Sequence, residues 1–258
     1  MRLSVPSYLE PGTWLENSRA AAGVDWISGV ELLFFAYDEE ARAILRRERA
    51  GLADLAGRLE FSLHLPDPLG PADEALVEAT RSFVKVYVLH PPLGAGVPAA
   101  AVAGAGASAA SASPEAWAEL VAAWRVRYGD DFLLEYTGEA AFAAAEAALP
   151  GLPLCPDTGV LLREGRSPAV FFRGVSPRVR EIHLHGLAAD PGGAAAPGPA
   201  AKDHAPFRAG EPWLAELLGE LGGYEGRIEL EIFDRASAFA AREALEETLS
   251  AGMKGGRP

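Results

Sequence analysis

Residues 29–65, GVELLFFAYDEEARAILRRERAGLADLAGRLEFSLHL, decide the fold because they contain one complete strand–helix–strand unit. The apolar run GVELLFFA at 29–36 predicts a buried strand, and LEFSLHL at 59–65 predicts a second one. Between them, residues 38–57 predict a helix with Asp38 as its N-cap. Strands that alternate with helices in this way are typical of a parallel sheet with crossover helices.

The same alternation continues on both sides of this unit. Eight stretches predict strands: LSVPSY (3–8), GVELLFFA (29–36), LEFSLHL (59–65), FVKVYVLH (83–90), DFLLEYT (131–137), LPLCPD (152–157), VREIHLHG (179–186) and RIELEIF (227–233). Helical stretches separate them, among them residues 114–129 with Ser113 as N-cap. Eight units in 258 residues predict an α/β protein, a single (β/α)8 TIM barrel that spans residues 1–258. No G-x-G-x-x-G follows the first strand, which disfavours an open dinucleotide-binding sheet.

Two Ala/Gly-rich segments, at about 94–113 and 187–201, interrupt the pattern, and we expect them to be flexible surface insertions. The net charge of −13 disfavours binding to a nucleic-acid backbone. A single cysteine, Cys155, excludes an internal disulfide and fits a reducing compartment. We see no signal segment and no apolar run long enough to span a bilayer. The sequence therefore predicts a soluble cytoplasmic protein and leaves its oligomeric state undecided.

All five histidines lie at or just beyond the end of a predicted strand: His64, His90, His183, His185 and His204. In a TIM barrel the carboxyl ends of the strands form the active-site face, so we expect these side chains to converge there. Histidine is a common metal ligand and the usual proton carrier near neutral pH. His183 and His185 are two residues apart and therefore share one face of their strand.

Carboxylates occupy further strand ends: Glu31, Glu135, Asp157 and Glu231. Burying so many ionisable groups is costly unless they pair or bind metal. The set suits a divalent transition metal such as Mn²⁺ or Zn²⁺. Taken singly, each residue has a purely structural alternative, such as a hydrogen-bonded core histidine. Glu229 and Glu231 share a face, so one of the two could simply line the barrel lower down.

In this arrangement the sequence resembles the xylose isomerase-like, type 2 apurinic endonuclease-like barrel superfamily. The resemblance implies that Glu135, Asp157, His183 and Glu231 bind the metal. The endonuclease branch adds histidines that match His64 and His90, and an Asp/His pair that resembles Asp203-His204. One position departs from the superfamily, because Val160 stands where a histidine often follows the aspartate of the sixth strand. The resemblance therefore implies one or two ions rather than three.

Shorter phrases resemble the cobamide-remodelling phosphodiesterase family called CbiR. They are SYLEPGTWLEN (7–17), GVELLFF (29–35), HLPDPL (64–69), and HLHG (183–186) followed by KDH (202–204). This resemblance implies a metal-dependent phosphodiesterase (a hydrolase) that cleaves the nucleotide loop of a cobamide. The products would be an α-ribazole-type nucleoside and cobinamide phosphate, and the substrate would be a small-molecule corrinoid.

For that reaction His185 is either a metal ligand or the proton carrier to the leaving group. An outer set could hold a second ion or orient the phosphate: His64, His90, Asp203 and His204. Aromatic residues near the first two strand ends could form a wall for the corrin ring: Tyr8, Trp14, Phe34, Phe35 and Tyr37. The alternative is that most of these aromatic side chains only pack between barrel and helices.

Three other functions fit the same residues. A sugar isomerase or epimerase would use Glu135 and Glu231 as acid and base on opposite faces of a metal-bound ketose. A DNA repair endonuclease would use the same ligands, but the acidic balance of the chain disfavours it. A non-catalytic metal or corrinoid carrier needs only the ligands.

Overall fold

The computed structural model describes residues 1–92, 113–188 and 202–255. Its strands are β1 (Arg2–Pro6), β2 (Ile27–Leu33), β3 (Glu60–His64), β4 (Val84–Leu89), β5 (Phe132–Glu135), β6 (Leu154–Cys155), β7 (Glu181–His183) and β8 (Arg227–Glu229). Its α-helices are α1 (Trp14–Ala22), α2 (Glu39–Leu55), α3 (Glu74–Thr80), α4 (Pro114–Tyr128), α5 (Glu139–Ala148), α6 (Thr158–Arg163), α7 (Pro168–Val175), α8 (Pro212–Glu220) and α9 (Arg235–Gly255). Two short 3₁₀ helices span Pro71–Asp73 and Ser176–Arg178.

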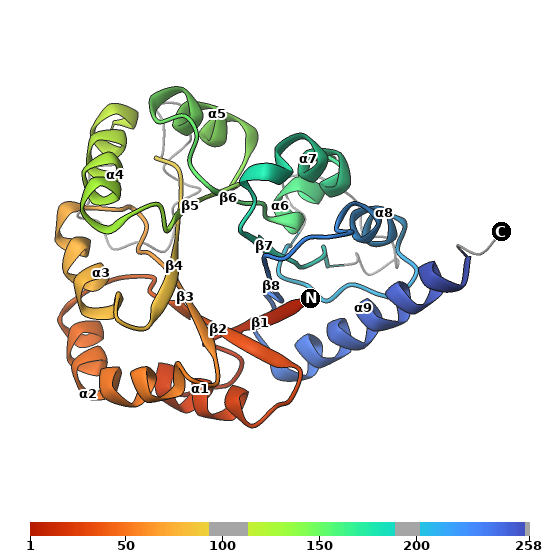
Figure 1. Ribbon diagram of the computed structural model, residues 1–258, viewed down its shortest axis with the longest axis horizontal. Helices are drawn as coiled ribbons and strands as arrows, with labels where there is room; N and C mark the ends of the chain where they lie inside the picture. The colour runs from red at the N-terminus through yellow and green to blue at the C-terminus, as the bar shows by residue number, and fades with distance from the viewer. Residues whose placement is uncertain (93–112, 189–201, 256–258) are drawn as a thin grey trace.

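The eight strands form one parallel sheet in the order β6-β5-β4-β3-β2-β1-β8-β7. β1 pairs with both β2 and β8, which brings the first and last strands side by side within the sheet. The two edge strands β6 and β7 approach each other through isolated parallel bridges, Leu154 to Val179 and Asp157 to His183. The sheet is therefore a nearly closed barrel with its helices outside, as Figure 1 shows.

The (β/α)8 TIM-barrel prediction is confirmed. Asp38 caps α2 by accepting the N–H of Ala41 at 2.9 Å, and Ser113 caps α4 in the same way, both as predicted. The strands are shorter than the apolar runs suggested, and β6 has only two residues. Between β6 and β7 the chain forms two short helices, α6 and α7. Ser167 caps α7, and Pro168 occupies its first turn.

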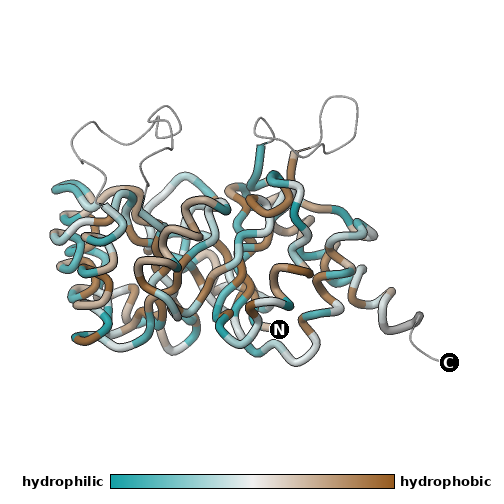
Figure 2. Tube along the Cα trace, turned by 90° about the horizontal axis from the view of Figure 1, so that it is seen from above, coloured by the Kyte–Doolittle hydropathy of each residue, from teal (hydrophilic) through white to brown (hydrophobic). Residues whose placement is uncertain are grey.

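Alternation along each strand separates an apolar outer face from a charged inner face. In β2, Val30 and Leu32 are buried in the apolar core, while Glu31 belongs to the other face. Burying each such aliphatic side chain contributes about 2 kcal/mol to folding. Figure 2 shows that hydrophobic and hydrophilic segments alternate along the chain. The apolar face holds the helices against the barrel, which leaves the inner face for polar residues.

The predicted insertions at 94–113 and 187–201 lie almost entirely outside the described residues. Within the described part of the chain, we find no helix that combines the length and the apolar character needed to cross a membrane.

Candidate metal centre

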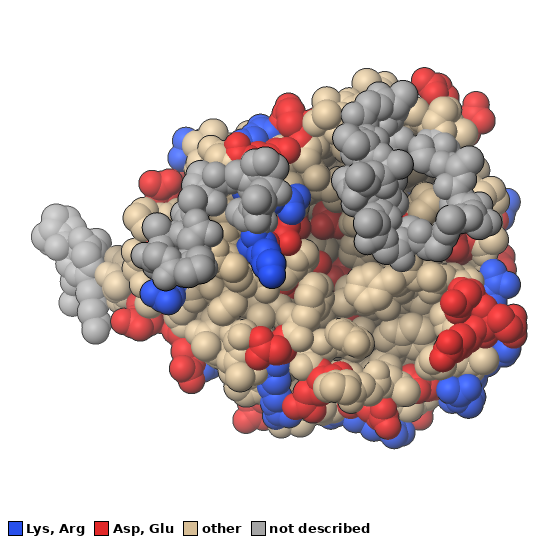
Figure 3. All heavy atoms as spheres, turned by 180° about the vertical axis from the view of Figure 1, so that it is seen from behind, with Lys and Arg blue, Asp and Glu red and all other residues tan. Residues whose placement is uncertain are grey.

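Four side chains from the last four strand ends meet in one buried cluster, which we call the central site: Glu135, Asp157, His183 and Glu231. Each offers one ligand atom, and these atoms all lie within 4.8 Å of one another. Glu135 and His183 end β5 and β7, and the bridge between Asp157 and His183 sets two ligands side by side. In Figure 3 this face of the molecule is hollowed, and acidic side chains lie inside the hollow.

His183 is the only nitrogen donor in this cluster, and its Nδ1 faces two carboxylates. It lies 3.3 Å from Oε1 of Glu135 and 3.4 Å from Oε2 of Glu231. That Glu231 oxygen is buried and has no hydrogen-bond partner among the described residues. One imidazole and three carboxylates in a buried space match the ligand preferences of Zn²⁺ and Mn²⁺. The residues present therefore fit the divalent ion that the sequence predicts.

Asp157 has two tasks in this site. Its Oδ1 accepts the N–H of Val160 at 2.8 Å, which caps α6. The same oxygen lies 3.0 Å from Nε2 of His185. Among the described residues, only the Val160 N–H forms a hydrogen bond to Oδ1, which leaves Oδ2 free to face a cation. The cap thus fixes the carboxylate at the mouth of the barrel.

The pKa values of the two flanking carboxylates show how strongly this cluster attracts positive charge. Burial by itself raises the pKa of Glu135, but nearby His90 and His183 lower it well below its usual range. Glu231 behaves in the same way, because His183, His185 and His204 outweigh the effect of burial on its pKa. Both carboxylates are therefore ionised in the folded protein and available to a cation.

A second group that could hold an ion consists of His64, His90 and Glu135. Oε2 of Glu135 lies 2.9 Å from Nε2 of His64 and 3.0 Å from Nε2 of His90. On its other side, Nδ1 of His90 lies 2.9 Å from Asp67. Burial lowers the pKa of His90, but the carboxylates of Glu135 and Asp67 raise it to about 10. The structure thus brings both predicted outer histidines to Glu135.

Asp67 is part of this site, and the sequence analysis did not assign it a role. It lies in the loop after β3, within the phrase HLPDPL. The signal that could have found it is an acidic residue directly after a strand-end histidine.

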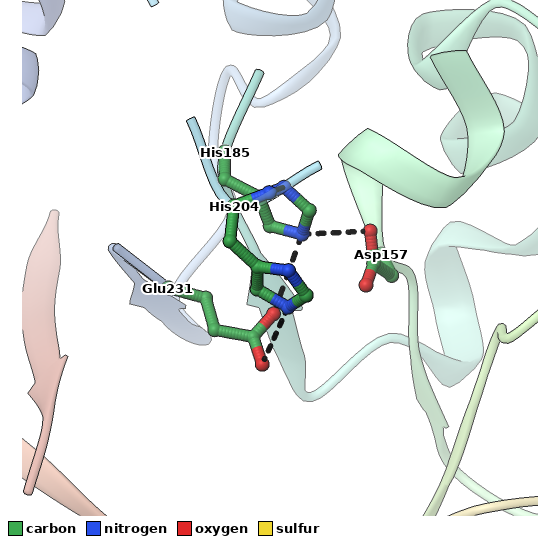
Figure 4. A group of neighbouring side chains, drawn as sticks. All are labelled: Asp157, His185, His204 and Glu231. Atoms are coloured by element: carbon green, nitrogen blue, oxygen red, sulfur yellow. Dashed lines mark hydrogen bonds and ion pairs between the residues drawn. The ribbon is translucent and has the colours of Figure 1, made fainter. Parts of the chain in front are cut away.

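His185 and His204 stack in parallel beside the central site, with ring centroids 4.4 Å apart (Figure 4). The backbone N–H of His204 donates to Nδ1 of His185 at 2.8 Å. A backbone N–H is always a donor, so Nδ1 of His185 carries no proton and Nε2 carries it. Nε2 of His185 lies 3.0 Å from Asp157 and 3.3 Å from Glu231, and it has no hydrogen-bond partner among the described residues. His185 therefore presents Nε2 to two carboxylates, and a further group that could hold an ion consists of Asp157, His185, His204 and Glu231.

Asp203 links the segment after β7 to the barrel. Its carboxylate forms an ion pair with Arg163 of α6 and contacts Nδ1 of His204 at 3.0 Å. His204 has a φ of 55°, a backbone conformation that is costly for a residue with a side chain. Burial lowers the pKa of His204, but Asp203 and Glu231 raise it to about 9. The structure thus uses Asp203 to hold His204 next to Glu231, which lies 3.5 Å from Nε2 of His204.

Val160, at the position where the superfamily resemblance leads one to expect a histidine, is buried in an apolar cluster with Tyr136 and Leu161. The backbone N–H of Val160 contributes to the site because it donates to Asp157. The side chain of Val160 contributes nothing to the site. The site accordingly lacks a polar side chain at this position.

The predicted aromatic wall contains side chains that pack against one another and side chains that are exposed, and some of both kinds line a pocket. Phe34 is buried and stacks on Trp14 with centroids 4.1 Å apart, and Tyr37 meets the edge of Phe34. These three side chains pack against one another, as the alternative interpretation held. Tyr8 and Phe35 are 54% and 71% exposed, and with Trp14 and Phe34 they line a pocket of about 310 Å³.

A layer of buried charge lies one step below the central site, and the sequence analysis missed most of it. Glu31, Glu181 and Glu229 point into the barrel with Arg227, which pairs with Glu181 at 3.3 Å and also reaches Glu60. Both carboxylate oxygens of Glu31 and of Glu229 have no hydrogen-bond partner in the part of the chain that is described. The period-two alternation of EIH and RIE was the signal that could have revealed this layer.

No protein-family model matches the chain, and no curated protein matches it. Solved structures match it over nearly its whole length. A D-tagatose 3-epimerase-like protein superposes with a TM-score of 0.67 at 18% identity, covering 99% of each chain. The probable 3-DHS dehydratase of petrobactin synthesis from Bacillus anthracis gives 0.63 at 15% identity, covering 95% of this chain and 98% of its own. An L-ribulose 3-epimerase gives 0.60 at 16% identity, covering 99% and 98%.

These matches show that the chain has the fold of the xylose isomerase-like TIM barrels. They contradict the cobamide phosphodiesterase that the sequence analysis put first. The three structures named above are of an epimerase-like protein, an epimerase and a probable dehydratase. The findings favour the alternative named with it, a sugar isomerase or epimerase.

Proposed function

We propose that this protein is a divalent-metal-dependent isomerase or epimerase of a small ketose sugar. The observation that carries the proposal is the placement of Glu135 and Glu231 around Nδ1 of His183, at 3.3 and 3.4 Å. The two carboxylates come from well-separated strands, β5 and β8, so a substrate held between them meets one on each side. Two bases on different sides of one carbon are what an exchange of configuration requires.

Glu135, Asp157, His183 and Glu231 would hold the ion, which when bound supplies the positive charge that polarises the carbonyl of the substrate. The chain supplies the proton transfers. One carboxylate takes the proton from the carbon next to the carbonyl. The other, which has first taken up a proton from solvent, returns that proton from the opposite side, and the first then releases its own proton to solvent. The pKa values of Glu135 and Glu231 lie well below their usual range, so both begin ionised and either can act first as base.

The remaining polar residues around the site orient these two bases. His64 and His90 hold Oε2 of Glu135, and Nε2 of His185 lies next to Asp157 and Glu231. Such contacts fix the carboxylates before the substrate arrives, which lowers the cost of reaching the reactive geometry. The similar structures support the proposal, since one of them is described as a 3-epimerase and another as 3-epimerase-like.

The test is incorporation of deuterium from solvent. Purified protein loaded with Mn²⁺, Co²⁺ or Zn²⁺ is incubated in D₂O with D-tagatose, D-fructose and L-ribulose, and proton NMR follows the signals next to the carbonyl. We expect the signal of one carbon-bound proton to disappear, together with the appearance of an epimer or aldose on chromatography. Glu231→Gln should lower the exchange rate at least about 100-fold because it removes a base.

Glu243→Gln is the matched control, since Glu243 is an exposed glutamate on α9. It should leave the exchange rate unchanged. Retention of every carbon-bound proton by the wild-type protein with all three metals and all three sugars would overturn the proposal.

A further inference from the structure

The two ring nitrogens of His183 face different carboxylates. Nδ1 faces Glu135 and Glu231, the flanking ligands of the central site. Nε2 faces the other way, toward Oε1 of Glu31 on β2, at 3.4 Å. Because two carboxylates of the central site lie next to Nδ1, Nδ1 is the nitrogen that is positioned to bind an ion. Nε2 is then left to carry the proton of the neutral ring.

Glu31 lies completely buried, and neither of its carboxylate oxygens has a hydrogen-bond partner in the described ranges 1–92, 113–188 and 202–255. The nearby arginine, Arg227, already pairs with Glu181 and Glu60. Nε2 of His183 likewise has no hydrogen-bond partner among the described residues. A buried carboxylate without a partner is costly, typically by a few kcal/mol. An N–H donor on Nε2 would therefore satisfy both orphaned groups at once.

We infer that Glu31 is a positioning residue for the metal centre, which accepts the Nε2–H of His183 while Nδ1 binds the ion. This contact fixes the tautomer and the orientation of the ring and makes Nδ1 a stronger donor. The inference rests on the metal site of the proposed function, but it is independent of which substrate the site turns over. In this interpretation Glu31 acts entirely through His183 and touches neither ion nor substrate.

The chain offers a matched control for Glu31. Glu229 is an equally buried carboxylate of the same interior layer, and its oxygens also lack hydrogen-bond partners among the described residues. No ion-pair contact within 4.0 Å joins Glu229 to His183 in the described part of the chain, whereas Glu31 makes one. Replacing either by glutamine removes one buried negative charge at nearly constant volume. Only the Glu31 change removes the negatively charged acceptor that faces Nε2, and leaves a weaker, neutral amide oxygen in its place.

The experiment measures Mn²⁺ binding by titration calorimetry on chelator-stripped wild type, Glu31→Gln and Glu229→Gln. Circular dichroism first verifies that each variant is folded. We expect Glu31→Gln to weaken Mn²⁺ binding by about 10- to 100-fold, and Glu229→Gln to change it by less than about threefold. Equal losses in both variants, or an unchanged affinity in Glu31→Gln, would overturn the inference.

A second measurement needs no variant. Imidazole ¹⁵N NMR of the Zn²⁺-loaded wild type should show His183 bound through Nδ1, with a slowly exchanging proton on Nε2. Zinc bound through Nε2 contradicts the role of Glu31 even if the metal site itself is correct. A wild type that binds neither Mn²⁺ nor Zn²⁺ removes the metal site, and with it both this inference and the proposed function.

Discussion

The barrel interior contains several buried carboxylates, and one of them is Glu229. Burial and the neighbouring charges of Glu31 and Glu181 raise its pKa well above the ordinary value of 4.5. The folded protein therefore holds this proton more tightly than the unfolded chain does. The contribution of Glu229 to stability is accordingly most favourable below pH 4.5 and is lost as the pH rises toward the raised pKa.

We therefore predict that Glu229→Gln stabilises the metal-free protein at pH 7. The gain should be about 1–3 kcal/mol, the cost of a buried polar group without a partner. It should shrink as the pH is lowered below 4.5, where the wild-type carboxyl becomes protonated in the unfolded chain as well. Urea denaturation at several pH values in the presence of EDTA measures this difference. A gain that is independent of pH would mean that Glu229 is not the titrating group.

Gly159 illustrates a close approach that only glycine allows. A Cβ built at this position would lie 2.0 Å from Cε1 and 2.2 Å from Nδ1 of His185. Gly159→Ala should therefore displace the His185 ring from Asp157 and cost about 1–3 kcal/mol of stability, measured by urea denaturation.

Gly174→Ala on α7 is the control, because a Cβ there meets no atom within 4 Å. It should be neutral or slightly stabilising, since alanine favours a helix. Equal stabilities for the two variants would contradict the close packing of His185 on α6.

For single residues, the sequence predicts which side chains come together in the site. It does not predict the contacts that orient them. The strand-end positions of His64, His90 and His183 brought them to Glu135 as expected. Asp67 was missed because it lies in a loop, where periodicity gives no direction to a side chain. The tautomer of His185 was equally out of reach, since it depends on a backbone N–H 19 residues away in the chain.

At the scale of elements, a residue that caps a helix can also be part of the site. Asp157 caps α6 and Asp38 caps α2, each through a carboxylate that accepts a backbone N–H. Only Asp157 also belongs to the central site. The loss of the cap can therefore be measured separately from the loss of a ligand.

We predict that Asp38→Ala lowers the free energy of unfolding by about 1 kcal/mol and leaves Mn²⁺ affinity unchanged. Asp54→Ala serves as control, because Asp54 is an exposed residue near the end of the same helix and caps nothing. Thermal denaturation and calorimetry of both variants check the prediction. A loss of Mn²⁺ affinity in Asp38→Ala would show that α2 contributes to the site.

Elements with strong periodicity or a clear cap could be predicted from the sequence, and short ones could not. Helices α2 and α4 begin at the residues that their caps Asp38 and Ser113 indicated. The helix α7 was missed because its eight residues, PAVFFRGV, follow closely on α6 and carry no long apolar period. The strand β6 is short because Pro153 and Pro156 flank it and neither has an N–H for the sheet.

At the scale of the whole molecule, closure of the barrel brings residues that are far apart in the sequence close together in space. Glu135, Asp157, His183 and Glu231 are spread over nearly 100 positions of the chain, yet their ligand atoms lie within 4.8 Å. The barrel order could be predicted from the alternation of strands and helices. The layer of buried charge beneath the site was harder to predict. Buried parallel strands are expected to be apolar on both faces, so a glutamate that faces the barrel interior is not expected.

An ion that binds only the folded barrel must also stabilise it. We predict that Mn²⁺ at about 100 times its dissociation constant raises the free energy of unfolding by about 2.7 kcal/mol, and that EDTA removes this gain. Thermal denaturation with and without the ion measures it. The increase should be absent in Asp157→Asn, and an undiminished increase in that variant would place the ion elsewhere.

The most direct test of the central claim is a crystal structure of the Mn²⁺-loaded protein with anomalous diffraction measured for manganese. The account predicts one strong anomalous peak bonded to Nδ1 of His183 and to carboxylate oxygens of Glu135, Asp157 and Glu231. The absence of a peak at these four residues, in a crystal whose protein has bound Mn²⁺, would contradict it.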